Sequence, residues 1–307
     1  MRLSTSNFNV KRMVAAAKGN FVSRSLLIAL LAIVLYQVMI SSNVISPSEG
    51  INLQQMNNIK MQRYAYEKSD IDMALVGSSI TAKIRSEYIG DKVYNIALRG
   101  GSTQTGLEIV RQKKAKPKVL LVELNDTISR PVDQELIGSL YNPFLYMLRA
   151  NFSMFKQEYR PVGVFLYNLT RLVGWKRESR EQNILNSPLR KMLLQRQKEK
   201  LTLGLSPEQK ELITEQANII KEQLEGIGSY QTRVVLFNPP GESSLEETLQ
   251  KREMQLLLDD WFPSDRFEWL VNPEKDWTTT DGVHLTINDA KVYGAYLRSQ
   301  LLDGVSG

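Results

Sequence analysis

Apolar residues are distributed along this chain in two different ways. Near the N-terminus they form one unbroken run, residues 25–40, with the sequence SLLIALLAIVLYQVMI. Beyond residue 70 they form short runs, which alternate with longer stretches in which polar and apolar positions are mixed. Short apolar runs of this kind are typical of strands in a parallel sheet whose two faces are covered by helices. We therefore predict an apolar helix followed by an α/β domain with three layers, αβα.

We expect about five parallel strands, at Met73–Val76, Val93–Ala97, Val119–Leu124, Val234–Phe237 and Phe267–Val271. In open parallel sheets, functional groups gather at the carboxyl ends of the strands. Residues that carry chemistry should therefore lie directly after a strand, and this expectation tests each candidate motif.

The third and fourth predicted strands are separated by about 109 residues, far more than a simple crossover needs. We predict a helical insertion at about residues 128–230. Its second part is charged, and Ser206, Pro207 and Gln209 are typical of a helix start, with Gly226 at the end. Its first part, Tyr141–Trp175, contains nine of the chain's 25 aromatic residues.

These aromatic residues have three interpretations. They form the core of the insertion, a lid over the cleft, or a surface that meets the bilayer or a membrane partner. An exposed apolar patch of more than roughly a few hundred Å² would favour the last two, because soluble monomers seldom carry one.

The N-terminal run predicts a transmembrane anchor at residues 25–45, since about 20 apolar residues cross the hydrocarbon core as a helix. Residues 1–24 contain five basic residues and no acidic ones, which predicts a cytoplasmic tail and places the rest of the chain outside the cytoplasmic membrane. A cleaved signal peptide is the main alternative, but the tail is long and no small-x-small cleavage site follows. We interpret residues 46–70 as a stalk and residues 71–303 as the main domain.

Composition excludes several kinds of site. The chain has no cysteine and one histidine, so disulfides, thiolate sites and multi-histidine zinc sites are excluded. The net charge of +6 belongs to the tail, because the remaining residues hold 39 − 5 = 34 basic and 33 acidic groups. A nearly neutral domain lacks the electrostatic footprint of nucleic-acid binding.

The first candidate motif is LVGSSIT, residues 75–81, in which a strand, a glycine turn and a helix start follow one another. A serine here has an exposed hydroxyl and an N–H that points into the cleft. On its own, such a junction is more often a turn with an N-cap serine.

The second motif is DGVHLT, residues 281–286, which contains the chain's single histidine. A serine nucleophile needs a base, and a carboxylate three residues before a histidine can hold the imidazole in one tautomer. The alternative interpretation is a surface histidine in a loop.

Two further motifs follow the second and third predicted strands. NIALRGGST, residues 95–103, ends in a double glycine that can present a backbone N–H, and ELND places Asn125 where its amide could donate to an oxyanion. Each is also an ordinary turn sequence.

Together the four motifs resemble the SGNH (GDSL-like) hydrolases, over residues 71–300 apart from the insertion. GSSI resembles the GDSL block with Ser79 as nucleophile, and DGVHLT is similar to the D-x-x-H block with Asp281 and His284. Gly100 falls at the glycine of the second block, with Gly101 as the alternative, and Asn125 falls at the oxyanion asparagine. Two positions depart from the family: Ser78 stands where Asp is usual, and Glu123 replaces a glycine.

The resemblance implies a flavodoxin-like SGNH fold and a Ser79–His284–Asp281 triad, with the N–H groups of Ser79 and Gly100 and the Asn125 amide as the oxyanion hole. It implies no metal and no cofactor. Anchored relatives act on acyl groups of cell-envelope or secreted polysaccharides, sometimes beside a multi-span membrane O-acyltransferase, so we expect an acyl-ester hydrolase or O-acyltransferase. A lipid or small-ester esterase is one alternative, and a non-catalytic binding or scaffold subunit with the same fold is the other.

Overall fold

The computed structural model describes residues 7–172, 184–185, 187–228 and 231–303. Its centre is a sheet of five strands in the order β2-β1-β3-β4-β5, and every neighbouring pair is parallel. The strands are β1 (Met73–Val76), β2 (Val93–Asn95), β3 (Val119–Glu123), β4 (Arg233–Phe237) and β5 (Glu268–Trp269). The predicted α/β fold with five parallel strands is confirmed, and this strand order is that of the flavodoxin-like class.

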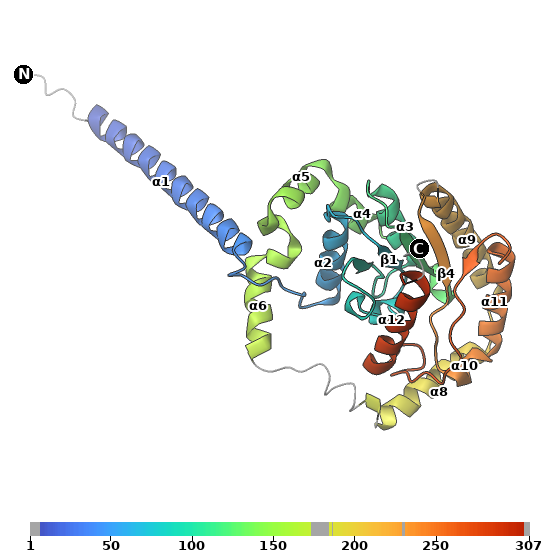
Figure 1. Cartoon of the computed structure of the whole chain (residues 1–307). Helices are drawn as coiled ribbons and strands as arrows, with labels where there is room; N and C mark the ends of the chain where they lie inside the picture. The colour runs from blue at the N-terminus through green and yellow to red at the C-terminus, as the bar shows by residue number, and fades with distance from the viewer. Residues whose placement is uncertain (1–6, 173–183, 186, 229–230, 304–307) are drawn as a thin grey trace, which may run out of the picture.

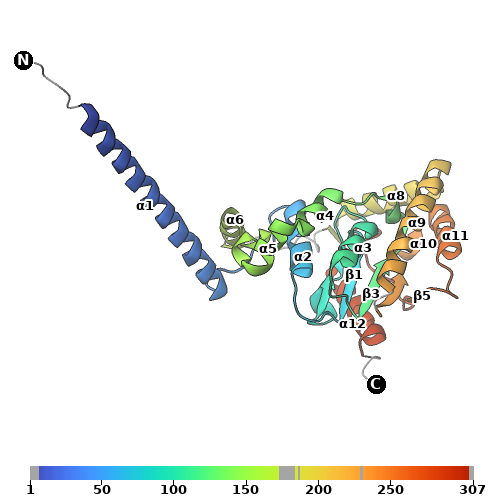
Figure 2. The same ribbon diagram turned by 90° about the horizontal axis from the view of Figure 1, so that it is seen from above.

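Side chains alternate between the two faces of the sheet and form a separate core on each. On one face, Val76, Leu120 and Leu236 pack under α2 (Leu53–Ala65), α3 (Thr103–Gln112), α9 (Pro207–Gly228) and α11 (Leu249–Trp261). On the other face, Leu75 and Leu121 pack under α12 (Ile287–Leu301). Figure 2 shows α12 on one side of the strands and α3 and α9 on the other. The αβα layering follows from the apolar residues of both strand faces.

The segment between β3 and β4 consists of helices. They are η3 (Asp126–Ser129), α4 (Gln134–Tyr141), α5 (Pro143–Asn151), η4 (Ser153–Phe155), η5 (Gln157–Tyr159), α6 (Pro161–Leu172), α8 (Pro188–Thr202) and α9. As predicted, α9 begins with a reciprocal cap, in which the N–H of Gln209 donates to Ser206 Oγ (3.2 Å) and the N–H of Ser206 donates to Gln209 Oε1 (2.8 Å).

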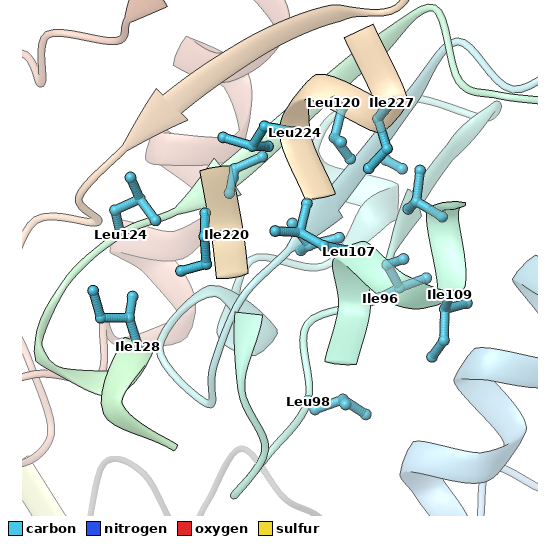
Figure 3. Close-up of a cluster of buried hydrophobic side chains, with 14 of the residues drawn as sticks. Ile96, Leu98, Leu107, Ile109, Leu120, Leu124, Ile128, Ile220, Leu224 and Ile227 are labelled. Atoms are coloured by element: carbon cyan, nitrogen blue, oxygen red, sulfur yellow. The ribbon is translucent and has the colours of Figure 1, made fainter. Parts of the chain in front are cut away.

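α9 is the crossover helix of the fold and not part of an added layer. Its Ile220, Leu224 and Ile227 lie in the main core beside Leu107 of α3 (Figure 3). The insertion proper is therefore the stretch from α4 to α8, shorter than the predicted 128–230. α9 and the insertion have the same helical pattern in the sequence, and only the packing of α9 against α3 separates them.

α1 (Asn7–Ser41) projects from the domain (Figure 1). Its segment Phe21–Ser41 is 21 residues long with a mean hydropathy of 2.0, and none of its most apolar stretch of 18 residues is buried. A helix of this length spans about 31 Å, close to the thickness of the hydrocarbon core. In the described part of the chain, this is the one helix long and apolar enough to cross a membrane.

The stalk predicted for residues 46–70 is wrong for its second half. α2 occupies Leu53–Ala65, and Met61 and Tyr64 on it are completely buried in the main core. A few large apolar side chains on one face are enough to dock a helix whose other positions are polar. The main domain therefore begins before the predicted residue 71.

Candidate active site

Two adjacent serines follow β1, and the structure gives them different surroundings. Ser78 is completely buried, with its N–H donating to Glu123 Oε2 (2.8 Å) and its hydroxyl to Glu123 Oε1 (2.5 Å). Ser79 is half-buried, and its Oγ lies 3.0 Å from His284 Nε2. The helix expected after this turn is only a 3₁₀ turn, η1 (Thr81–Lys83). Of the two hydroxyls, that of Ser79 is the one within hydrogen-bond reach of a base.

Asp281 and His284 lie in a tight turn before α12. One carboxylate oxygen of Asp281 accepts the backbone N–H groups of Val283 (3.2 Å) and His284 (3.0 Å), and the other lies 2.7 Å from His284 Nδ1. Because the carboxylate accepts the Nδ1 proton, the neutral ring presents the lone pair of Nε2 toward Ser79. The structure thus places Ser79 beside His284, 205 positions later in the sequence, and joins the three predicted residues in one hydrogen-bonded row.

The pKa of Asp281 is lowered by the same contacts. Burial would raise this pKa, but the hydrogen bond and charge of His284 and the two backbone N–H groups outweigh burial. The Asp281 carboxylate therefore stays ionised below the pH at which a free aspartate would take up a proton, and remains able to hold the imidazole.

A second set of contacts holds this turn from outside. The Glu242 carboxylate accepts the Thr279 hydroxyl (2.6 Å), and the Thr279 hydroxyl oxygen accepts the N–H of Gly282 (2.9 Å). Arg190 of α8 donates to the carbonyl oxygen of Thr279 (2.9 Å) and pairs with Glu242 (3.0 Å). A helix of the insertion therefore braces the turn that carries Asp281 and His284.

Gly282 makes the turn possible, and its replacement gives a testable prediction. Its φ of +102° is disfavoured for residues with a side chain, and an added Cβ would lie 2.5 Å from Leu245 Cδ1. We expect Gly282→Ala to lower the free energy of unfolding by about 1–3 kcal/mol. The rate of ester hydrolysis should also fall, because the substitution shifts His284. Chemical denaturation and initial rates measure the two effects.

Gly138 provides the control for this substitution. It lies in α4, and an added Cβ would meet nothing within 4 Å. Gly138→Ala should be neutral or stabilising by up to about 1 kcal/mol. Equal losses of stability and of rate in the two variants would contradict a special role for the conformation of Gly282.

Glu123 lies beneath the serine turn and joins it to Asn125. Its carboxylate is completely buried and accepts hydrogen bonds from Ser78, the N–H of Thr81 (3.2 Å), the Asn125 amide (2.8 Å) and the Thr127 hydroxyl (3.4 Å). Gly77 leaves the necessary space, since a Cβ there would lie 2.3 Å from Glu123 Oε2. Every one of these partners is a donor, which is the environment that an ionised carboxylate requires.

The Asn125 amide has a fixed orientation. Its Oδ1 accepts the N–H (2.9 Å) and the hydroxyl (2.7 Å) of Thr127, while Nδ2 donates to Glu123. The backbone donor identifies which end of the amide is the oxygen, so the NH₂ group belongs to the side of Glu123 and the serine turn. One of its two N–H bonds is used there, and no residue in the described part of the chain accepts the second.

The double glycine follows β2 at the same edge of the sheet. The N–H of Leu98 donates to the carbonyl oxygen of Gly77 (2.8 Å), which ties this loop to the serine turn. The N–H of Gly101 donates to the carbonyl oxygen of Leu98 (3.1 Å) and so belongs to the turn itself. This contact favours Gly100 over Gly101 as a possible donor. The role of Gly100 in an oxyanion hole stays a prediction.

A groove with a volume of about 840 Å³ lies between α2, α4 and α6, and its lining includes Gly100 but not Ser79, Asn125 or His284. Its polar lining includes Gln54, Asn58, Arg99, Arg149 and Arg160. Another cavity of about 460 Å³ lies at the amino ends of the strands, beside Asp72 and Lys118, away from the serine turn. Within the described residues, no group of three or more His, Asp or Glu side chains could hold a metal ion.

Sequence reasoning missed the bracing residues. Arg190 and Glu242 carry no local signal, because each is an ordinary charged residue whose partner is distant in sequence. Glu123 did carry a signal, because it is a charged residue at the end of the apolar strand VLLVE. Such a residue is either buried with hydrogen-bond partners, or the strand ends before it.

Comparison with known proteins adds little to this picture. No protein-family model matches the chain, and no curated protein matches it. A search of solved structures finds one described as "The structure of a putative platelet activating factor from Streptococcus pneumonia". The two chains are 12% identical, with a TM-score of 0.41 over 86% of this chain and 97% of the other.

Proposed function

We propose that this chain is a serine-dependent acyl-ester hydrolase or O-acyltransferase of the SGNH type. The observation that carries the proposal is the row formed by Ser79 Oγ, His284 and Asp281, with distances of 3.0 Å and 2.7 Å. A serine hydroxyl, an imidazole and a carboxylate in this order are the parts that nucleophilic acyl transfer requires.

The chemistry follows from the positions of the protons. Ser79 Oγ attacks the ester carbonyl carbon while His284 Nε2 takes its proton, and Asp281 stabilises the resulting imidazolium. The leaving alcohol takes that proton as the C–O bond breaks, which leaves an acyl group on Ser79. Water or a sugar hydroxyl then attacks this acyl-enzyme, with His284 again as base, and Ser79 is regenerated.

The oxyanion of the tetrahedral intermediate needs donors at the carboxyl edge of the sheet. We assign this role to the backbone N–H of Ser79, the N–H of Gly100 and the free N–H of the Asn125 amide. Hydrogen bonding of Asn125 to Glu123 and Thr127 supports the assignment, since it fixes the amide before substrate binds. Such preorganised donors are typically worth about 3–4 kcal/mol each in the barrier.

We propose acylated cell-envelope or secreted polysaccharide as the substrate, outside the cytoplasmic membrane, with residues 25–45 as anchor and the N-terminus inside. The groove beside Gly100 supports a hydroxyl-rich ligand, because amide and guanidinium groups line it. A multi-span membrane O-acyltransferase is the proposed partner, and would supply the acyl groups that this chain removes or passes on.

A fluorophosphonate probe tests the proposal on the full chain in detergent micelles. An activated Ser79 should displace fluoride and form one covalent adduct, which peptide mass spectrometry locates at residue 79. Heat-denatured protein and the Ser79→Ala variant should both stay unlabelled, because the first lacks the His284 contact and the second lacks the nucleophile.

Two other outcomes would change the assignment. A folded wild-type chain that takes up no probe would contradict an enzyme and favour the non-catalytic binding subunit. Labelled protein that cleaves lipid or small esters but leaves acetylated polysaccharide intact would retain the mechanism and overturn the substrate.

A further inference from the structure

The insertion presents an apolar surface to solvent, named here the aromatic face. It consists of Phe144 and Met147 on α5, Phe152 and Phe155 around η4, and Val162 and Phe165 on α6, with exposed fractions from 42% to 70%. On α6, Val162, Phe165 and Leu169 follow one another at spacings of three and four residues, which places them on one side of the helix. This side of α6 points away from the domain, the reverse of an ordinary surface helix.

The aromatic face is continuous with the apolar helix α1. Figures 1 and 2 both show α5 and α6 beside the C-terminal end of α1. The Tyr36 hydroxyl donates to the carbonyl oxygen of Tyr159 (2.6 Å), and Gln37 Oε1 accepts the N–H of Met154 (3.1 Å). Ile40 is only 4% exposed. The last turns of α1 are therefore docked on the segment that carries Phe152 and Phe155.

These contacts fix the depth of the face relative to the span. Tyr36 precedes the end of the segment Phe21–Ser41 by five residues, which is about 7.5 Å along a helix. If this segment crosses the hydrocarbon core, the groups that bind Tyr36 and Gln37 must reach into the boundary between headgroups and acyl chains. Interfacial helices bury their apolar side at a depth of about 5–10 Å, so the two depths agree.

The charges around the face also suit a lipid surface. Residues 142–170 contain three basic residues, Arg149, Lys156 and Arg160, and a single acidic one, Glu158. Glu158 is buried and paired with Arg63 at 2.6 Å. The segment therefore has a surplus of basic groups near the exposed aromatic ones, with Arg160 exposed and Lys156 and Arg149 half-buried. This combination favours an interface with anionic headgroups.

We infer that the aromatic face lies in the bilayer interface of the leaflet into which the C-terminal end of α1 emerges. The inference rests on α1 as a membrane span and not on ester chemistry. The domain is then held flat on the membrane by two attachments, α1 and α5–α6. The groove beside Gly100 includes Val162 and Gly163 of α6 in its wall, so this orientation keeps the groove next to the lipid surface.

Single cysteines test the inference, because the chain has none of its own. Phe144→Cys, Phe165→Cys and Leu256→Cys are labelled with an environment-sensitive NBD fluorophore, and the full chain is reconstituted into phosphatidylcholine–phosphatidylglycerol vesicles. Leu256 is the matched control, since it is 70% exposed. It belongs to α11, and this helix lies on the side of the domain away from α1 (Figure 1). A label at Leu30, inside the span, gives the signal expected for full burial in lipid.

The labels at residues 144 and 165 should emit at shorter wavelength than the label at 256. Doxyl groups on the lipid chains should quench them to an extent approaching that at residue 30, whereas aqueous iodide should quench only the label at 256. Iodide quenching at 144 and 165 equal to that at 256 would overturn the inference. Protection from iodide without quenching by doxyl lipid would also overturn it, in favour of a protein partner. Far-UV circular dichroism checks that each variant is folded.

Discussion

Replacing Ser79 with alanine is expected to lower kcat for an activated ester by roughly three to six orders of magnitude, with little loss of stability. The hydroxyl is the group that forms the acyl-enzyme, and its deletion leaves only whatever the oxyanion donors achieve with water. Ser79 is half-buried, and its side chain contacts the His284 ring, so the folded state loses one hydrogen bond, worth about 1 kcal/mol.

Ser78→Ala is the matched control, because the same atom is removed one residue away. The Ser78 hydroxyl donates to Glu123 and accepts the N–H of Ile80 (3.2 Å), and it is completely buried. We expect this variant to lose about 1–3 kcal/mol of stability and to retain far more activity than Ser79→Ala. Initial rates and urea denaturation of both variants decide the matter. Substantial turnover by Ser79→Ala would contradict the proposed nucleophile.

Glu123→Ala should have the largest effect on stability, with a loss of about 3–5 kcal/mol. The carboxylate accepts hydrogen bonds from four residues in a fully buried place, and alanine would remove the acceptor of the Ser78, Thr81 and Asn125 donors. Asn125 would also lose the contact that holds its amide, so the activity of the folded fraction should fall by about 10²-fold or more. Thermal unfolding and kcat measurements of purified protein test both effects.

Glu123→Gln separates shape from charge. An amide fits the same space, but its NH₂ group would face other donors, so the variant should also lose stability. Glu247→Gln makes the same change at an exposed site and should stay within about 0.5 kcal/mol of wild type. A Glu123→Gln variant as stable and as active as Glu247→Gln would show that no ionised carboxylate is needed.

A double substitution tests whether the carboxylate of Glu123 takes the place of the Asp that is usual at position 78 in the SGNH pattern. The SGNH pattern has Asp where Ser78 stands and glycine where Glu123 stands. Ser78→Asp alone would put two carboxylates in one buried site and should be strongly destabilising. Adding Glu123→Gly should recover part of that loss, because a single acid is again present among the donors. If the stability loss of the double variant equals the sum of the losses of the two single variants, this exchange is contradicted.

The sequence by itself determined the elements that depend on local pattern. The apolar run of α1, the five strand positions and the capping box at Ser206 are all readable from a few neighbouring residues. The hydrogen bonds within DGVH are local too, because Asp281 accepts the N–H and contacts the ring of a histidine only three residues away. The ends of the strands were predicted less accurately: β2 is two residues shorter than expected and β5 is three residues shorter. Pairing with a neighbouring strand decides where a strand stops.

Only the tertiary structure decided which distant groups meet. The resemblance to the GDSL block selects Ser79 from two adjacent serines, and the structure gives the physical reason, since Glu123 takes Ser78 into the core and leaves Ser79 for His284. The stalk was misassigned because α2 is buried through contacts with residues far along the chain. Arg190 and Glu242 were missed for the same reason, and the sequence alone could not decide whether the aromatic residues of the insertion form a core, a lid or a membrane-facing surface. A side chain's burial and its hydrogen-bond partners are properties of packing between elements, and sequence periodicity describes each element alone.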